Sequence, residues 1–125
     1  MIKQVIVIRK DLKMRRGKEL TQFCHSSMKF LQDKVVRYIQ GESDLGITLV
    51  ELEWMLNHNP KIVVQVNSEQ ELLDIYAHAI RECIQVALIK DLGLTEFKEP
   101  TYTCLAIGPD EAHLIDKITG HLPLY

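Results

Sequence analysis

The fold is decided by a stretch near the start of the chain, which reads Val5-Ile6-Val7-Ile8, then the charged segment 9–16, then Gly17-Lys18-Glu19-Leu20-Thr21-Gln22-Phe23-Cys24-His25. Four β-branched residues in a row predict a central strand that is buried on both faces. The residues from Gly17 onward predict a helix to about Ile39, because Gly41 is a typical stop signal. A strand that leads into a long helix is typical of an α/β domain.

The remaining segments alternate between strand and helix. We expect strands at Lys61–Val66, Val86–Ile89 and Tyr102–Ile107, and helices at Leu49–Leu56, from Ser68 to about Cys83 with Leu72, Ile75, Tyr76, Ala79 and Ile80 inward, and from Pro109 to about Ile118. The pairs Thr48 with Glu51 and Ser68 with Glu71 have capping-box spacing, and Pro109 before two acids suits a first helical turn. This order predicts an α/β fold: a three-layer α/β/α single domain, residues 1–125, with a four-stranded mixed β-sheet.

The composition is that of a globular protein, with 46% hydrophobic residues in 125 positions. The three cysteines are widely spaced and odd in number, so we expect reduced thiols in a cytoplasmic protein. No apolar run reaches the ~18 residues of a membrane span, and no secretory signal opens the chain, so no membrane partner is expected.

Positive charge is concentrated in the first third of the chain. Residues 1–40 contain ten Lys/Arg and three Asp/Glu, whereas residues 41–125 contain five and fourteen. Six of the ten bases lie within ten positions, and they are Arg9, Lys10, Lys13, Arg15, Arg16 and Lys18. Such a cluster can attract a polyanion. The alternative is a solvated loop that is balanced by acidic neighbours.

One face of the first helix carries a cation, an amide and an imidazole. Lys18, Gln22 and His25 have helical spacing that places them on the same face. The residues suited to burial fall roughly opposite, and they are Leu20, Cys24, Leu31, Val35 and Tyr38. The polar face is suited to hold a ligand, and the alternative is the solvated face of an amphipathic helix.

A carboxylate follows the third predicted strand. If this strand is parallel to the first, Asp91 meets Lys18 at one edge of the sheet, where ligands of α/β proteins gather. The two side chains form either a plain ion pair or a catalytic pair, in which Asp91 orients a water and Lys18 faces an oxyanion or a phosphate. Thr95 could add a hydroxyl hydrogen bond. No nucleotide-cofactor motif, serine-hydrolase elbow or compact metal cluster occurs, so we expect no cofactor and no metal.

Several of these segments together resemble the type II peptidyl-tRNA hydrolase family, the archaeal and eukaryotic form. The similarity is carried by Gly17-Lys18-x-x-x-Gln22-x-x-His25, by segment 59–64, by Asp91-x-Gly93-x-Thr95, and by segments 106–109 and 115–122. The resemblance implies an enzyme that hydrolyses the ester bond between peptide and tRNA, without a cofactor, and it allows a homodimer. It implies two groups of site residues: catalytic Lys18, Gln22, Asp91 and Thr95, and, as contacts to the tRNA acceptor arm, Arg9, Lys10, Lys13, Arg15, Arg16 and His25.

The chain also departs from the pattern of that family. Segment 20–26 is bulkier at Phe23, the loop has Leu92, Leu94 and Glu96 at its variable and last positions, and segment 38–49 is longer than usual. These differences leave open a non-catalytic RNA- or protein-binding module that keeps the fold, and a hydrolase of another ester or amide. Retention of all four implied catalytic residues favours the peptidyl-tRNA hydrolase.

Overall fold

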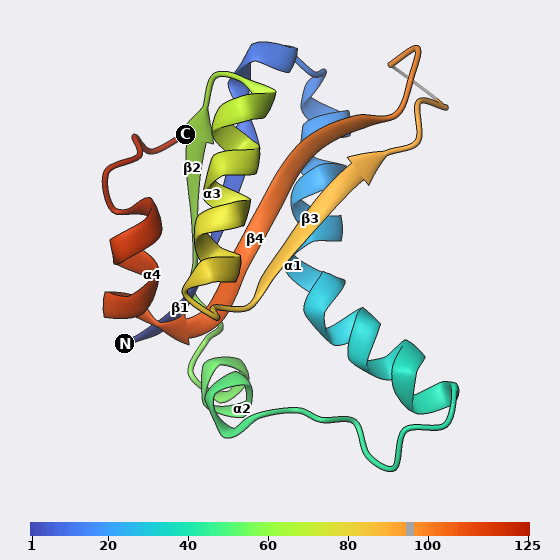
Figure 1. The fold of residues 1–125 in the computed structure, drawn as a ribbon, viewed down its shortest axis with the longest axis vertical. Helices are drawn as coiled ribbons and strands as arrows, with labels where there is room; N and C mark the ends of the chain where they lie inside the picture. Colours follow the sequence, from blue (N-terminus) through green and yellow to red (C-terminus); the bar gives the residue numbers. More distant parts are fainter. Residues whose placement is uncertain (95–96) are drawn as a thin grey trace.

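The computed structural model describes residues 1–94 and 97–125, and within them the chain forms a four-stranded mixed sheet flanked by helices (Figure 1). The strands are β1 (Ile2–Arg9), β2 (Lys61–Val66), β3 (Val86–Asp91) and β4 (Thr101–Glu111), in the spatial order β2-β1-β4-β3. The helices are α1 (Arg16–Ile39), α2 (Leu49–Leu56), α3 (Glu69–Arg81) and α4 (Ala112–Thr119), with a short 3-10 helix at Lys10–Leu12. The predicted α/β fold with a four-stranded mixed sheet is therefore confirmed.

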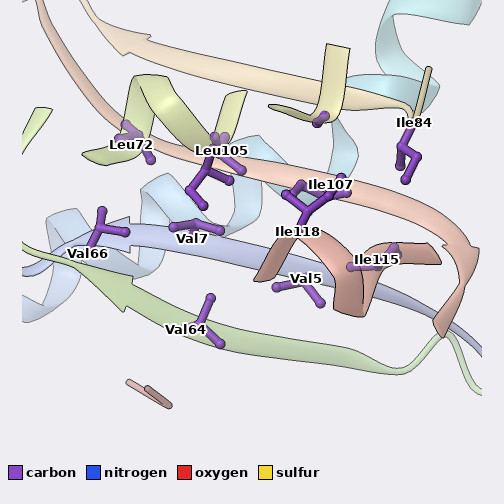
Figure 2. Packing of buried hydrophobic residues seen from close by; sticks show 12 residues of the cluster. Val5, Val7, Val64, Val66, Leu72, Ile84, Leu105, Ile107, Ile115 and Ile118 are labelled. Atoms are coloured by element: carbon purple, nitrogen blue, oxygen red, sulfur yellow. The ribbon is translucent and has the colours of Figure 1, made fainter. Parts of the chain in front are cut away.

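The main hydrophobic core lies between the sheet and the helices α3 and α4, which stand in front of the sheet in Figure 1. Val5 and Val7 of β1 and Leu105 and Ile107 of β4 are at most 1% exposed on this face. They meet side chains of α3 and α4, as Figure 2 shows, and those side chains include Leu72, Ile115 and Ile118. Alternate residues of each strand point to this face, as the pleat of a β-strand requires.

The opposite face of the sheet, under α1, is partly polar. Gln4 of β1 is fully buried there, its Nε2 donates to the backbone oxygen of Ser27, and its Oε1 accepts from the Ser27 hydroxyl at 2.7 Å. Thr103 of β4 is also fully buried, and its hydroxyl donates to Oε1 of Gln22 at 2.7 Å. Buried polar groups are tolerated where each finds a partner, and these do.

This polar contact reverses the expected orientation of α1. The buried residues of α1 are Gln22, Ser26, Phe30 and Lys34, which are spaced four apart. The predicted inward face is wrong, because Leu20, Val35 and Tyr38 are 53%, 39% and 48% exposed. Cys24 is exposed as well. The helix buries this side because Thr103 of the sheet bonds to Gln22 and Glu51 of α2 pairs with Lys34, while Phe30 packs edge-on against Trp54.

Helix α2 is tied to α1 by a buried ion pair. Thr48 and Glu51 form the predicted capping box, and Glu51 also accepts from Nζ of Lys34 at 2.5 Å and from Nε2 of Gln85. Burial raises the pKa of Glu51, but these hydrogen bonds outweigh it, so the pKa lies below its usual 4.5. The charged side chain of Glu51 is therefore stable although the residue is only 2% exposed.

Two other expectations about helices are wrong. Pro109, Asp110 and Glu111 continue β4 instead of starting the last helix, because Asp110 and Glu111 pair with Lys3 and Ile2 of β1. The helix α4 consequently begins at Ala112.

In α3, Leu72, Ile75 and Ala79 are buried as expected, but Ile80 is 53% exposed. The Ser68 side chain caps α3 by accepting from the backbone N–H of Glu71, as expected. The Glu71 carboxylate, however, accepts from the N–H of Asn67, so it does not complete the capping box.

Residues 123–125 cover the outer edge of β2. Leu124 forms an antiparallel bridge with Val64, and the backbone N–H of Tyr125 donates to Val63 at 3.1 Å. The phenol of Tyr125 donates to Oε2 of Glu19 at 2.5 Å, and its ring contacts Phe23 edge-on. This segment, which we call the β2 strap, therefore joins the sheet edge to the first turns of α1.

Candidate active site

The site lies at the sheet edge where β1 and β3 both end. The two strands have the same direction, because each pairs antiparallel with β4, which lies between them. The end of β1 leads through the 3-10 helix into α1, and the end of β3 delivers Asp91. The two strands thus have the parallel direction that the sequence argument required, although β4 lies between them.

Lys18 and Asp91 meet at this edge. The ammonium of Lys18 donates to Oδ1 of Asp91, and the side chains are 17% and 10% exposed. The other carboxylate oxygen, Oδ2, accepts from the backbone N–H of Gly93 at 2.9 Å. The carboxylate is therefore held at both oxygens, by a side chain of α1 and by its own loop.

The electrostatics of the pair favour an ionised Asp91. Burial raises the pKa of Asp91, but the hydrogen bonds from Lys18 and Gly93 and the charges of Lys18 and His25 lower it further than burial raises it. The pKa consequently lies below its usual 3.8. At neutral pH this group is a carboxylate that accepts hydrogen bonds and is a weak base.

The pair opens into a cleft of about 360 Å³. The cleft is lined by residues of α1 and of the end of β3, and they are Lys18, Thr21, Gln22, His25, Ile89, Lys90, Asp91, Leu92 and Leu94. Four of the residues singled out in the sequence therefore share one cavity, which combines a cation, an anion, an amide and an imidazole. Thr95, the remaining predicted catalytic residue, lies outside the described residues.

Gln22 is fixed from the floor of the cleft. It is 2% exposed, and its Oε1 accepts from the hydroxyl of Thr103. Its backbone oxygen accepts from the thiol of Cys104 at 3.5 Å. Since the amide oxygen is occupied, the amide nitrogen is the end of Gln22 that can donate toward a ligand in the cleft.

Thr103 is the residue that sequence reasoning missed. Ile89 pairs with Cys104 and Lys90 with Tyr102, so β4 contains one extra residue at this point. Because of this bulge, Thr103 and Cys104 both contact Gln22. The only sequence clue was a polar residue within an otherwise apolar strand, which does not predict a bulge.

The basic segment lies next to this cleft in the chain, between β1 and Lys18. Lys10, Lys13, Arg15 and Arg16 are all exposed. Arg9 differs from them, because its side chain is 11% exposed and its guanidinium donates to both carboxylate oxygens of Asp11 and to the backbone oxygen of Tyr102. Four of the five predicted phosphate contacts are thus accessible, whereas Arg9 holds the loop in shape.

In residues 1–94 and 97–125, no three His, Cys, Asp or Glu side chains are grouped closely enough to hold a metal ion. Among the helices of this described part, none is long and apolar enough to cross a membrane.

Comparison with known proteins places the chain in a family. The family model described as "Peptidyl-tRNA hydrolase PTH2" matches residues 2–125. A peptidyl-tRNA hydrolase of Thermococcus onnurineus is 41% identical over 122 residues, which are 98% of this chain and 96% of that protein. One of Methanopyrus kandleri is 40% identical over 99% of this chain and 98% of that protein. The human protein "Peptidyl-tRNA hydrolase 2, mitochondrial" is 37% identical over 98% of this chain and 64% of its own length. These similarities confirm the resemblance drawn from the sequence, and the chain belongs to the peptidyl-tRNA hydrolase PTH2 family.

Proposed function

We propose that this protein hydrolyses the ester bond of peptidyl-tRNA and releases free tRNA and the peptide. The observation that carries the proposal is the Lys18–Asp91 pair, set beside Gln22 in an open cleft of a family member. A plain structural ion pair has no need of an adjoining cavity that is lined by an oriented amide and an imidazole. The basic segment 10–16 adds a surface suited to the phosphates of the tRNA acceptor arm.

The proposed reaction has no covalent enzyme intermediate. Asp91 orients a water, whose oxygen attacks the ester carbonyl carbon, and Lys18 stabilises the oxyanion that develops. The bond from the carbonyl carbon to the ribose oxygen then breaks, the ribose oxygen takes up one of the two protons of the water, the second proton is released to solvent, and the peptide leaves as a carboxylate. Because the pKa of Asp91 is lowered, this residue is better suited to orient the water than to keep its proton.

Two other residues have supporting roles in this proposal. The amide nitrogen of Gln22 donates to the oxyanion or to the ribose, since Thr103 holds the oxygen end. Thr95 helps to hold the water or the substrate, as the family resemblance implies. His25 lines the same cleft and adds a contact to the substrate.

Binding of tRNA is assigned to Lys10, Lys13, Arg15 and Arg16, which are exposed. Arg9 contributes by shaping the loop through Asp11. If these four side chains each neutralise one phosphate, the logarithm of the binding constant falls with the logarithm of salt concentration with a slope of about −3 to −4.

The test is release of labelled peptide from an N-blocked aminoacyl-tRNA over a salt series, with wild type and Asp91→Asn. Asparagine keeps the size of the side chain but removes the charge, so tRNA binding persists and release falls. Salt-dependent binding without release by the wild type would favour the non-catalytic binding module instead. We also propose that residues 1–125 act as one domain, that the protein forms a homodimer and that it is cytoplasmic. Gel filtration tests the oligomeric state, and cell fractionation tests the location.

A further inference from the structure

The catalytic cleft has an apolar wall that has no role in the proposed reaction. Leu92 and Leu94 line the cleft, although they are 68% and 83% exposed. Ile89 lines it as well, from the end of β3. Large aliphatic side chains that stay in contact with water beside a reacting pair are typical of a surface that is covered when a ligand binds.

The loop that carries the two leucines is bonded to the catalytic carboxylate. They lie on either side of Gly93, whose N–H donates to Oδ2 of Asp91. Gly93 has a φ of +80°, and a Cβ at this position would lie 2.7 Å from the carbonyl carbon of Glu99. The turn therefore requires glycine and packs against the returning chain. The backbone on either side of Gly93, which carries Leu92 and Leu94, is consequently held close to Asp91.

The other surfaces of the site account for most of the substrate near its reacting carbon. The basic segment suits the phosphates, and Lys18, Gln22 and Asp91 suit the carbonyl, the water and the ribose oxygen. Among the groups that remain is the side chain on the α-carbon next to the ester carbonyl. This group is attached one bond from the reacting carbon, so it must lie in or at the mouth of the same cleft.

From this placement we propose that Leu92 and Leu94 bind the side chain of the last amino acid of the peptide, and that they give the enzyme a preference for apolar residues at that position. The inference rests on the proposed function and adds a substrate class to it. Two lysines, Lys18 and Lys90, and one carboxylate, Asp91, line the same cleft, so its net charge is positive and the site also disfavours a lysine or arginine side chain at this position.

The terminal adenine of the tRNA is the other group that an apolar wall could contact. Sites that bind single-stranded bases commonly stack them on the flat face of an aromatic ring or a guanidinium. Leucine is branched and offers no such face. The chemistry of the wall therefore favours an aliphatic or aromatic amino-acid side chain over a base.

The experiment uses a single tRNA that is acylated chemically with N-acetyl-leucine, N-acetyl-glycine or N-acetyl-lysine, so that only the side chain differs. Initial rates at low substrate concentration give kcat/KM for wild type, Leu92→Ala and Leu94→Ala. The matched control is Leu56→Ala, since Leu56 is 82% exposed but lies at the end of α2. All three substitutions replace exposed side chains, and a thermal melt verifies that each variant is folded.

We expect wild type to hydrolyse the leucyl substrate about tenfold faster than the glycyl one, and the lysyl substrate slowest. Loss of either cleft leucine lowers the rate on the leucyl substrate about fivefold and leaves the glycyl rate within twofold, because less apolar surface is covered. The Leu56 variant matches wild type on all substrates.

Three results would overturn the inference. If the cleft variants lose rate equally on the leucyl and glycyl substrates, the leucines contact the end of the tRNA and not the amino-acid side chain. Equal rates of wild type on all three substrates would show that the cleft does not select a side chain. If the wild-type enzyme releases none of the three N-acetylated amino acids, the proposed function is wrong, and the inference that rests on it is wrong as well.

Discussion

Replacement of Lys18 by methionine separates the catalytic role of the pair from its structural role. Methionine keeps the length of the side chain but removes the ammonium that donates to Asp91. Removal of one well-placed oxyanion donor lowers the rate by about 10²–10³. We therefore expect kcat/KM for peptidyl-tRNA to fall by that factor.

The effect of the same change on stability is worked out from the surroundings of Asp91. Loss of one partner from a fully buried ion pair costs about 3–5 kcal/mol. The Asp91 side chain is 10% exposed, borders an open cleft and keeps the N–H of Gly93, so we expect about 2 kcal/mol. With an unfolding entropy of about 2.1 cal/mol/K per residue, a chain of 125 residues then melts about 8 °C lower. A domain with an ordinary stability of about 5–15 kcal/mol stays almost fully folded at 25 °C, so unfolding does not explain the lost rate.

The assay pairs peptide release at 25 °C with a thermal melt of the same sample. Lys29→Met is the control, because Lys29 also lies on α1 and pairs with Asp33, but both side chains are about 40% exposed. Such a surface pair contributes about 0.3–0.5 kcal/mol, so activity and melting temperature of this variant stay near wild type. A Lys18→Met enzyme that retains kcat/KM within threefold of wild type would refute the assigned role of Lys18.

Three further predictions concern the β2 strap, the Lys34–Glu51 ion pair and the Cys104 thiol. Tyr125→Phe removes the hydrogen bond to Glu19 but keeps the ring, so we expect about 0.5–1 kcal/mol lower stability in urea unfolding; no change would show that the phenol does not hold the β2 strap. Lys34→Met leaves the buried Glu51 carboxylate without its cation and costs about 3–4 kcal/mol at pH 7. Because the folded pKa of Glu51 is lowered, its contribution is present above pH 4.5 and lost as pH falls through the lowered value, so the variant loses less stability on acidification than wild type does. Burial raises the pKa of the Cys104 thiol to about 11, so a thiol reagent at pH 8 modifies two of the three cysteines in the native protein and all three after denaturation; fast reaction of a third thiol in the native protein would contradict the structure.

Local sequence signals predicted the strands and the helix starts well. The β-branched run at Val5–Ile8 is a central strand, and Thr48 with Glu51 forms the expected capping box. Both signals act between residues that are close in the chain. Pro109 misled the same kind of reasoning, because pairing of Asp110 with Lys3 of β1 outweighs the local preference for a helix start.

The orientation of α1 could not be obtained from its own pattern. Its inward residues Gln22 and Lys34 are buried because Thr103 and Glu51, which lie elsewhere in the chain, satisfy them, whereas the Ser26 hydroxyl donates to the backbone oxygen of Phe23 within the helix. A periodicity argument ranks positions by their own polarity, so it assigned the apolar side to the core. The same limit hid Thr103, whose position depends on a bulge in β4. The meeting of Lys18 with Asp91 was foreseen as a condition on strand direction, and the sheet order supplies that condition.

The sheet order has a consequence for this protein while it is being synthesised on the ribosome. β4 is the last of these four strands to be synthesised, yet it lies between β1 and β3 and is the only strand that pairs with β3 in the described sheet. A nascent chain that stops before Thr101 lacks the strand that aligns β3 with β1, so the sheet edge that brings the lysine and the aspartate together is not formed. An unfinished copy of this protein, itself still esterified to its own tRNA, therefore lacks the means to cut itself free.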